Sequence, residues 1–273
     1  MGRVLSHTLL AAPGARPRSW LFVLHGFLGA GRNWTTVARR VTAVRPDWGA
    51  VLVDLRLHGA SQGFVPPHTL AACAGDLTAL AGAIDRPAAA VLGHSAGGKV
   101  ALEYLGRRPA GLRQAWIVDA DPSAAESARD AWELLRTVRA MPPEFKTRSE
   151  LVAGLVRAGL ERWTAEWMAT NVEHTGTGYR WRLEFDALED LLADVLRADL
   201  WQTVEQAPPG VELHFVKATR STAVSDRSAA RLRRIAAAGG PAVLHEVEGG
   251  HWLNADNPDA LVALLSRDLP ACA

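Results

Sequence analysis

Short apolar runs alternate with amphipathic stretches along the first part of the chain. Four runs have the length of a buried strand, namely Trp20–Leu24, Ala50–Leu55, Ala88–Leu92 and Ala115–Val118. Apolar residues recur at helical spacing over Asn33–Val44, Leu70–Ile84 and Ala96–Leu105, and Val4–Leu10 reads as an additional first strand. Because the central runs are apolar on both faces and alternate with helices, the pattern predicts a parallel sheet covered by helices on both sides.

This alternation stops after residue 121 and resumes at residue 210. The segment between shows helical patterns and no convincing strand, over Ala125–Ala140, Ser149–Leu160, Thr164–Asn171 and Phe185–Leu200. The later elements are a strand, a helix, a strand and a helix, over Val211–Val216, Ser228–Ala238, Ala242–Val247 and Pro258–Leu269. We therefore predict an α/β core built from residues 1–121 and 210–273. Residues 122–209 would form a helical cap over the carboxyl ends of the strands, where open α/β sheets bind ligands.

Composition and charge narrow the classes of function. The chain has 273 residues, of which 48% are hydrophobic and 22% charged, as in ordinary globular proteins. The formal net charge of +1, with Lys and Arg scattered, argues against nucleic acid as a partner. Cys73 and Cys272 suggest neither a disulfide framework nor a metal site. No apolar run reaches the roughly 18 residues of a membrane span, and no leader segment is evident, so we expect a cytoplasmic protein.

The sharpest motif is Gly93-His94-Ser95-Ala96-Gly97, which lies between the strand Ala88–Leu92 and the helix that follows. A serine on such a tight strand-to-helix turn needs small neighbours, because strand and helix approach each other closely there. The turn lifts the hydroxyl above the sheet, and the positive end of the helix favours developing negative charge. This context predicts that Ser95 is a nucleophile.

A second motif, His25-Gly26-Phe27-Leu28-Gly29, follows the strand Trp20–Leu24. Acyl transfer creates an oxyanion, which needs backbone N–H groups that are already in position. The order of the two motifs along the chain predicts that the amides of Phe27 and Ala96 form this oxyanion hole.

The general base is predicted to be His251, in Gly249-Gly250-His251-Trp252, because this histidine alone of nine lies in a Gly-flanked loop after a late strand. A hydroxyl nucleophile needs a base with a pKa near neutrality. His214 and His245 fall inside strands and are interpreted as structural, and His94 would point away from Ser95 on the turn. His58 reads as part of a structural turn.

The acid that orients His251 has several candidates. The commonest place is after the strand Val211–Val216, but residues 217–221 contain no carboxylate there, and Asp226 comes only later. Asp119 and Asp121 follow the strand Ala115–Val118. We favour Asp119, because it lies at the strand end, from which a carboxylate can reach an imidazole and hold its tautomer. Asp121, Asp226 and Asp186 remain alternatives.

These motifs together resemble the α/β-hydrolase superfamily, and within it the small serine esterases of the YbfF and abhydrolase-domain-11 type. The similarity is carried by HGFLG, DLRLHGAS, GHSAGGK, IVDADP and GGHWLNADNP, and it covers nearly the whole chain except the cap. The resemblance implies an acid after the sixth strand and a serine at the usual acid position, which fall on Asp119 and Ser221. The chain departs from this group by a second carboxylate, Asp121, and by lacking the usual Gly pair before Ser221.

The cap is rich in tryptophan, and some of these side chains should line an apolar pocket. We expect Trp163 and Trp167 of the cap, with Trp252 beside the base, to do so, and Lys99 to be a surface or cap contact. The predicted function is hydrolysis of a small apolar carboxylic ester or thioester by Ser95, Asp119 and His251, without cofactor or metal. Two alternatives stay open. One is another triad reaction, such as C–C bond hydrolysis, elimination or cofactor-free perhydrolysis, and the other is non-catalytic ligand binding. The sequence does not indicate the oligomeric state.

Overall fold

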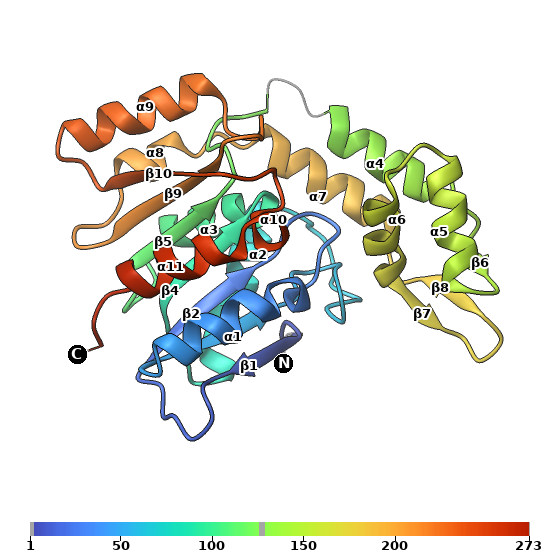
Figure 1. Cartoon of the computed structure of the whole chain (residues 1–273), viewed down its shortest axis with the longest axis horizontal. Coiled ribbons are helices and arrows are strands. Elements are labelled where there is room, and N and C mark those ends of the chain that lie inside the picture. Colours follow the sequence, from blue (N-terminus) through green and yellow to red (C-terminus); the bar gives the residue numbers. More distant parts are fainter. Residues whose placement is uncertain (1–2, 126–128, 273) are drawn as a thin grey trace.

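A seven-stranded sheet forms the centre of the molecule (Figure 1). The computed structural model of the chain describes residues 3–125 and 129–272. The strand order is β1-β3-β2-β4-β5-β9-β10, and β1 alone is antiparallel to its neighbour. The strands are β1 (His7–Leu10), β2 (Ser19–Leu24), β3 (Trp48–Val53), β4 (Ala88–His94), β5 (Gln114–Val118), β9 (Glu212–Ala218) and β10 (Ala242–Val247). The predicted, mostly parallel α/β sheet is confirmed.

Helices cover both faces of this sheet, because its central strands are apolar on both sides. Every residue of β3 and β5 is buried. One face packs against α1 (Thr35–Val44) and α11 (Pro258–Asp268). The other face packs against α2 (Leu70–Ala83), α3 (Ala96–Gly106) and α9 (Asp226–Ala237), and its apolar core continues into the cap.

Among the element boundaries that differ from the predictions, two have a clear local reason. The strand predicted over Ala50–Leu55 runs from Trp48 to Val53, because the next residue, Asp54, turns its carboxylate to the loop amides of Gly31 and Ala60. The helix predicted from Asn33 starts instead with a 3₁₀ turn over Gly31–Trp34, which runs directly into α1.

Most of the segment between β5 and β9, called the cap segment below, forms a separate lobe beside the sheet, whereas its last helix lies against α3 of the core (Figure 1). Part of the helix predicted over Ala125–Ala140 falls on residues 126–128, which lie outside the described residues. The described helices of the cap segment are α4 (Arg129–Arg139), α5 (Arg148–Arg157), α6 (Arg162–Met168), α7 (Phe185–Arg197) and α8 (Trp201–Glu205), with a 3₁₀ turn at Ala169–Asn171.

The cap segment also contains a three-stranded antiparallel sheet, so the prediction of a cap without strands is wrong. Its order is β6-β8-β7, with β6 at Glu144–Phe145, β7 at Val172–His174 and β8 at Tyr179–Trp181. Strands this short show no recognisable alternation in sequence. A Cβ at Gly178 would overlap the Phe145 carbonyl, so β8 depends on glycine to approach β6.

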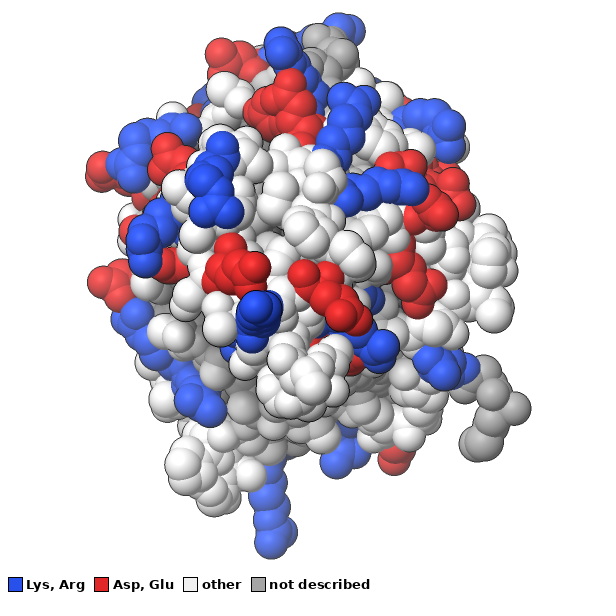
Figure 2. All heavy atoms as spheres, turned by 90° about the vertical axis from the view of Figure 1, so that its right-hand side faces the viewer, with Lys and Arg blue, Asp and Glu red and all other residues white. Residues whose placement is uncertain are grey.

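One buried lysine holds the cap segment to the core at two places along the chain. Lys99 lies on α3, and its Nζ donates to the carbonyls of Ser123, Val195 and Ala198 at 2.8, 3.0 and 2.9 Å. Ser123 lies where the chain leaves β5, and the other two lie at the end of α7. The cap face of the molecule interleaves basic and acidic side chains with uncharged ones (Figure 2). Lys99 is therefore an internal contact between core and cap rather than one of these surface charges.

Candidate active site

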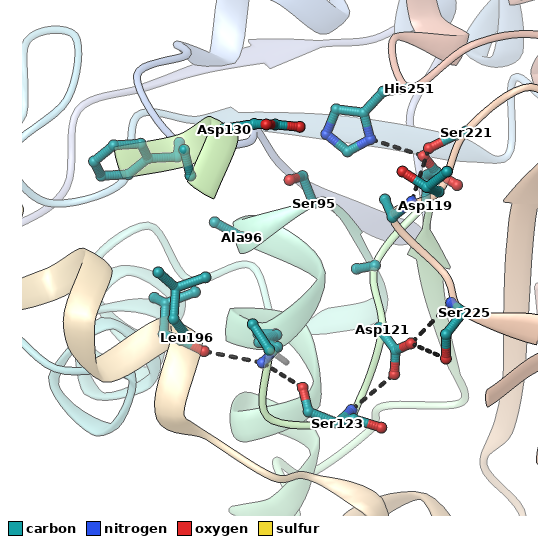
Figure 3. Close-up of a pocket in the computed structure, with 18 of the residues that line it drawn as sticks. Ser95, Ala96, Asp119, Asp121, Ser123, Asp130, Leu196, Ser221, Ser225 and His251 are labelled. Carbon is teal, nitrogen blue, oxygen red and sulfur yellow. Dashed lines mark hydrogen bonds and ion pairs between the residues drawn. The ribbon is translucent and has the colours of Figure 1, made fainter. Parts of the chain in front are cut away.

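Ser95 stands on a sharp turn between β4 and α3. Its backbone has φ 53° and ψ −122°, a conformation that L residues rarely adopt. Its amide donates to the Val118 carbonyl at 3.0 Å, which extends the ladder between β4 and β5 to the turn itself. The strained turn places the Ser95 side chain at the wall of a pocket, directly at the N-terminus of α3 (Figure 3).

The glycines beside Ser95 are required by close backbone approach. A Cβ at Gly93 would overlap the Gly97 carbonyl, and a Cβ at Gly97 would overlap the carbonyl of His25. At Gly98, a Cβ would lie 2.6 Å from Ala120 Cβ. These distances explain in physical terms why a serine turn of this kind needs small residues on both sides.

The loop after β2 brings a second backbone amide to the same pocket. Phe27 and Ala96 both line it, and the described residues offer neither of their amides an internal hydrogen-bond acceptor. His25 holds this loop in place, because its Nε2 accepts from the Leu55 amide at 3.0 Å and its Nδ1 donates to the Gly26 carbonyl at 2.7 Å. Burial lowers the pKa of His25 to about 4, so the ring is neutral at pH 7.

His251 contacts a buried carboxylate. Its Nδ1 lies 2.7 Å from Asp119 Oδ2, while Asp119 Oδ1 accepts from the Ala218 amide at 3.0 Å. Burial alone would raise the pKa of Asp119, but hydrogen bonds from His251, Ser221 and Ala218 outweigh it and hold the pKa below its usual value. A carboxylate that stays ionised beside Nδ1 leaves Nε2 of His251 free to act as a base. Ser95 and His251 both line the pocket, and their side chains point toward each other (Figure 3).

The structure separates the candidate acids clearly. Asp121 points away from His251 and accepts from Ser123, Ser225 and Ser228. Asp226 is fully exposed in the first turn of α9 and lies 3.7 Å from Lys217 Nζ. Neither carboxylate therefore reaches His251, because Asp121 is hydrogen-bonded to neighbouring serines and Asp226 lies in solvent near Lys217.

Asp186, the remaining alternative, is also far from this role. It lies on α7, exposed, and pairs with Arg139 of α4 at 2.6 Å. Ser221, by contrast, lines the pocket and donates to Asp119, in the position that the resemblance implied.

A second histidine, predicted from the sequence to point away from Ser95, holds the backbone of His251 in place. His94 Nε2 donates to the His251 carbonyl at 2.7 Å, and the two ring centroids are 4.7 Å apart. Burial lowers the pKa of His94 to about 3, so it remains neutral. The Asp256 carboxylate accepts from the Gly250 amide at 2.9 Å and holds the other side of the loop. The only sequence signal for His94 is its place beside Ser95.

The pocket has a volume of about 910 Å³ and lies between the sheet and the cap segment. Of the three tryptophans expected there, Trp167 and Trp252 line the pocket, whereas Trp163 does not. Trp163 is 47% exposed and packs edge-on against Trp252 from one helical turn before Trp167, outside the wall. The cap contributes further apolar wall residues that sequence reasoning did not single out, namely Leu134, Leu192, Val195, Leu196 and Trp201.

The chain matches a model of the alpha/beta hydrolase family over residues 21–264. It is 24% identical over 243 residues to the sn-1-specific diacylglycerol lipase ABHD11 of Danio rerio, a match that spans 87% of this chain and 74% of that protein. Among residues 3–125 and 129–272, no helix is long and apolar enough to cross a membrane.

Solved structures share the fold. A marine microorganism esterase superposes with a TM-score of 0.82 at 22% identity, covering 95% of this chain and 97% of that one. The E-2-(acetamidomethylene)succinate hydrolase superposes with a TM-score of 0.77 at 19% identity, covering 98% of this chain and 100% of that one. At these identities the similarity establishes the arrangement of the elements.

Proposed function

Because this chain belongs to the α/β hydrolase family, we propose that it is a serine hydrolase that cleaves carboxylic esters or thioesters through an acyl-enzyme intermediate. Ser95 is the nucleophile, His251 the general base and Asp119 the acid of the triad. The amides of Phe27 and Ala96 form the oxyanion hole.

The observation that carries this proposal is the 2.7 Å contact between His251 Nδ1 and Asp119 Oδ2, beside a serine on a strained turn. The three residues come from loops after β10, β5 and β4, which are far apart in sequence. A fully buried carboxylate at Nδ1 stabilises the imidazolium that forms when the ring takes a proton. This arrangement suits proton transfer from a hydroxyl at Nε2.

In the first half-reaction, Ser95 Oγ attacks the acyl carbon while His251 Nε2 takes its proton. Negative charge moves onto the carbonyl oxygen, where the amides of Phe27 and Ala96 stabilise it. One such donor contributes roughly 3–4 kcal/mol in a well-characterised hydrolase. His251 then returns the proton to the departing alcohol or thiol, and the acyl group remains on Ser95.

In the second half-reaction, His251 takes a proton from water, which attacks the acyl carbon and releases the acid. The same two amides stabilise the second oxyanion, and Ser95 recovers its proton from His251. Asp119 and Ser221 keep the ring oriented in both steps through the hydrogen bonds to the Asp119 carboxylate.

An apolar acyl group is the substrate feature that the pocket favours. The pocket has a volume of about 910 Å³, and the cap side of its wall includes Leu, Val and Trp side chains beside the charged Arg129, Asp130 and Asp199. The lipase and esterase named among the similar proteins support the same substrate class. We therefore propose an ester or thioester with an aliphatic acyl chain directed toward α7.

The test is labelling with a fluorophosphonate probe, together with turnover of p-nitrophenyl esters of increasing acyl length. Ser95→Ala should lose labelling and turnover while keeping its circular dichroism and melting temperature. Ser123→Ala is the matched control, because Ser123 also lines the pocket but bonds Ser228 and Trp201. Full labelling of Ser95→Ala would refute the proposal.

The alternatives use the same pocket and are separated by substrate. Diketones cleaved faster than any ester would favour C–C bond hydrolysis by the same residues. A single labelling event without repeated ester turnover would favour a binding protein on a hydrolase scaffold.

A further inference from the structure

A second cluster of reactive side chains lies on the far strands of the sheet, away from the pocket. His214 of β9, His245 of β10 and Asp268 at the end of α11 place one ligand atom each within 4.8 Å of one another. His214 pairs in register with Val243 and His245 with Val216, so both imidazoles project from the same face of the sheet. Of these three residues, His214 is buried, and the other two are partly exposed. Because β10 is an edge strand, a small ion can enter from solvent.

The two imidazoles are spaced almost as a metal ion would require. His214 Nδ1 lies 3.0 Å from His245 Nε2. Two nitrogens bound at the usual Zn–N length in a tetrahedral site lie about 3.3 Å apart. If the proton of His245 moves from Nε2 to Nδ1 and the ring tilts outward, this hydrogen-bonded pair becomes a chelate, with the Asp268 carboxylate as the third ligand.

The surroundings of His214 resemble those of a metal-binding imidazole. Its other nitrogen, Nε2, lies 3.4 Å from the Glu212 carboxylate and 3.3 Å from the Gln114 amide nitrogen, which donates to that carboxylate at 2.7 Å. Trp116 stacks on the ring with centroids 4.1 Å apart. A proton on Nε2 directed at a carboxylate leaves the Nδ1 lone pair free, which is the usual outer-shell arrangement of a metal-bound histidine.

We propose that His214, His245 and Asp268 form a binding site for a divalent transition-metal ion of the Zn²⁺ type. Two imidazoles and one carboxylate suit such an ion, and water would complete its coordination. Burial lowers the pKa of both histidines, which favours the neutral form of each ring. Arg267 pairs with both oxygens of Asp268 at 2.6 Å and competes with the ion.

The consequence of this site is structural support for the strands that carry the catalytic loops. Strand β9 ends at Ala218, whose amide binds Asp119, and β10 leads into the loop of His251. An ion would tie both strands to the end of α11. We therefore expect a higher melting temperature with metal, and no requirement of metal for ester turnover.

The experiment is a Zn²⁺ titration of the full chain after treatment with a chelator, followed by calorimetry and by thermal unfolding. One bound Zn²⁺ and a rise in melting temperature are expected for the natural sequence. His245→Ala and Asp268→Asn should each weaken binding at least tenfold and lose the rise. His174→Ala, which removes an exposed histidine of the cap, should behave as the natural sequence does.

A further variant tests the competing charge. Arg267→Gln should bind Zn²⁺ more tightly, because it frees the Asp268 carboxylate without removing a ligand. No binding to the natural sequence, or equal binding by His245→Ala that still folds, would overturn the proposal. Weaker binding by Arg267→Gln would overturn it in its three-ligand form.

Discussion

Backbone strain at the level of single residues marks the ends of two neighbouring strands. Ser95 has φ 53° and Asp119 has φ 47°, and such conformations cost about 1–3 kcal/mol each. Hydrogen bonds to the next strand keep both in place, from the Ser95 amide to Val118 and from the Asp119 amide to Val216. The strained conformations of Ser95 and Asp119 therefore lower the stability of the fold, and they direct both side chains above the edge of the sheet.

Substitution of Asp119 should impair catalysis, whereas substitution of Asp121 should lower stability. Asp119→Asn should lower kcat for a p-nitrophenyl ester by about 10³-fold or more, because an amide holds the wrong tautomer of His251. Asp121→Asn should leave kcat within a few-fold and lower the melting temperature, since it weakens only the bonds to Ser123, Ser225 and Ser228. The reverse ranking in steady-state kinetics would contradict this assignment.

At the level of elements, α3 serves both the site and the cap. It begins directly after Ser95, and one turn later Lys99 reaches the carbonyl of Ser123 near the start of the cap segment and two carbonyls at the end of α7. The three N–H groups of an ammonium match three carbonyls, so the hydrogen bonds of this connection are complete. Because α3 contacts both the sheet and the cap segment, a displacement of the cap would act on the helix that begins directly after Ser95.

Removing this connection should destabilise the protein more than removing an ordinary lysine contact. Lys99→Met leaves three carbonyls without a donor, and unpaired buried groups cost about 1–3 kcal/mol each, so we expect a loss of about 3 kcal/mol or more. Lys217→Met is the matched control, because its Nζ donates to the single carbonyl of Val224. Urea denaturation measures the free energy of unfolding of both variants. Equal losses in the two would argue against a special role of Lys99 in holding the cap segment.

At the level of the whole molecule, neutral imidazoles are built into the interior. His25, His58 and His94 are buried, and burial lowers their pKa values to about 4, 3 and 3. An unfolded histidine titrates near 6.5. As the pH falls below 6.5, the unfolded chain therefore binds protons that the folded chain does not bind, and the free energy of unfolding decreases.

The free energy of unfolding should therefore fall steeply between pH 6.5 and 5. Each histidine that stays neutral in the folded chain contributes up to about 1.4 kcal/mol per pH unit to this slope, so three such histidines give a limit of about 4 kcal/mol per unit. Urea denaturation across this range checks the slope. His58→Gln should reduce the slope, whereas His174→Gln, at an exposed position, should leave it unchanged. A flat profile for the natural sequence would contradict the prediction.

Local patterns were sufficient where the chemistry depends on neighbours in sequence. The strand-turn-helix around Ser95 and the Gly-flanked loop around His251 are readable because close backbone approach demands glycine at nearby positions. The acid was ambiguous, since several carboxylates follow strands and their direction depends on the turn after each strand. The short cap strands and the outward position of Trp163 were missed, because neither leaves a periodic signal.

The sequence by itself determined the sheet, its two helical layers, the insertion after β5 and the turns that carry Ser95 and His251. These follow from hydrophobic periodicity and glycine placement, which act over a few residues. Only the tertiary structure decided that Asp119 rather than Asp121 meets His251, that Lys99 holds the cap, and that His214 and His245 meet Asp268. Each of these contacts joins residues brought together by strand order and by the packing of α3 and α11, which no local pattern encodes.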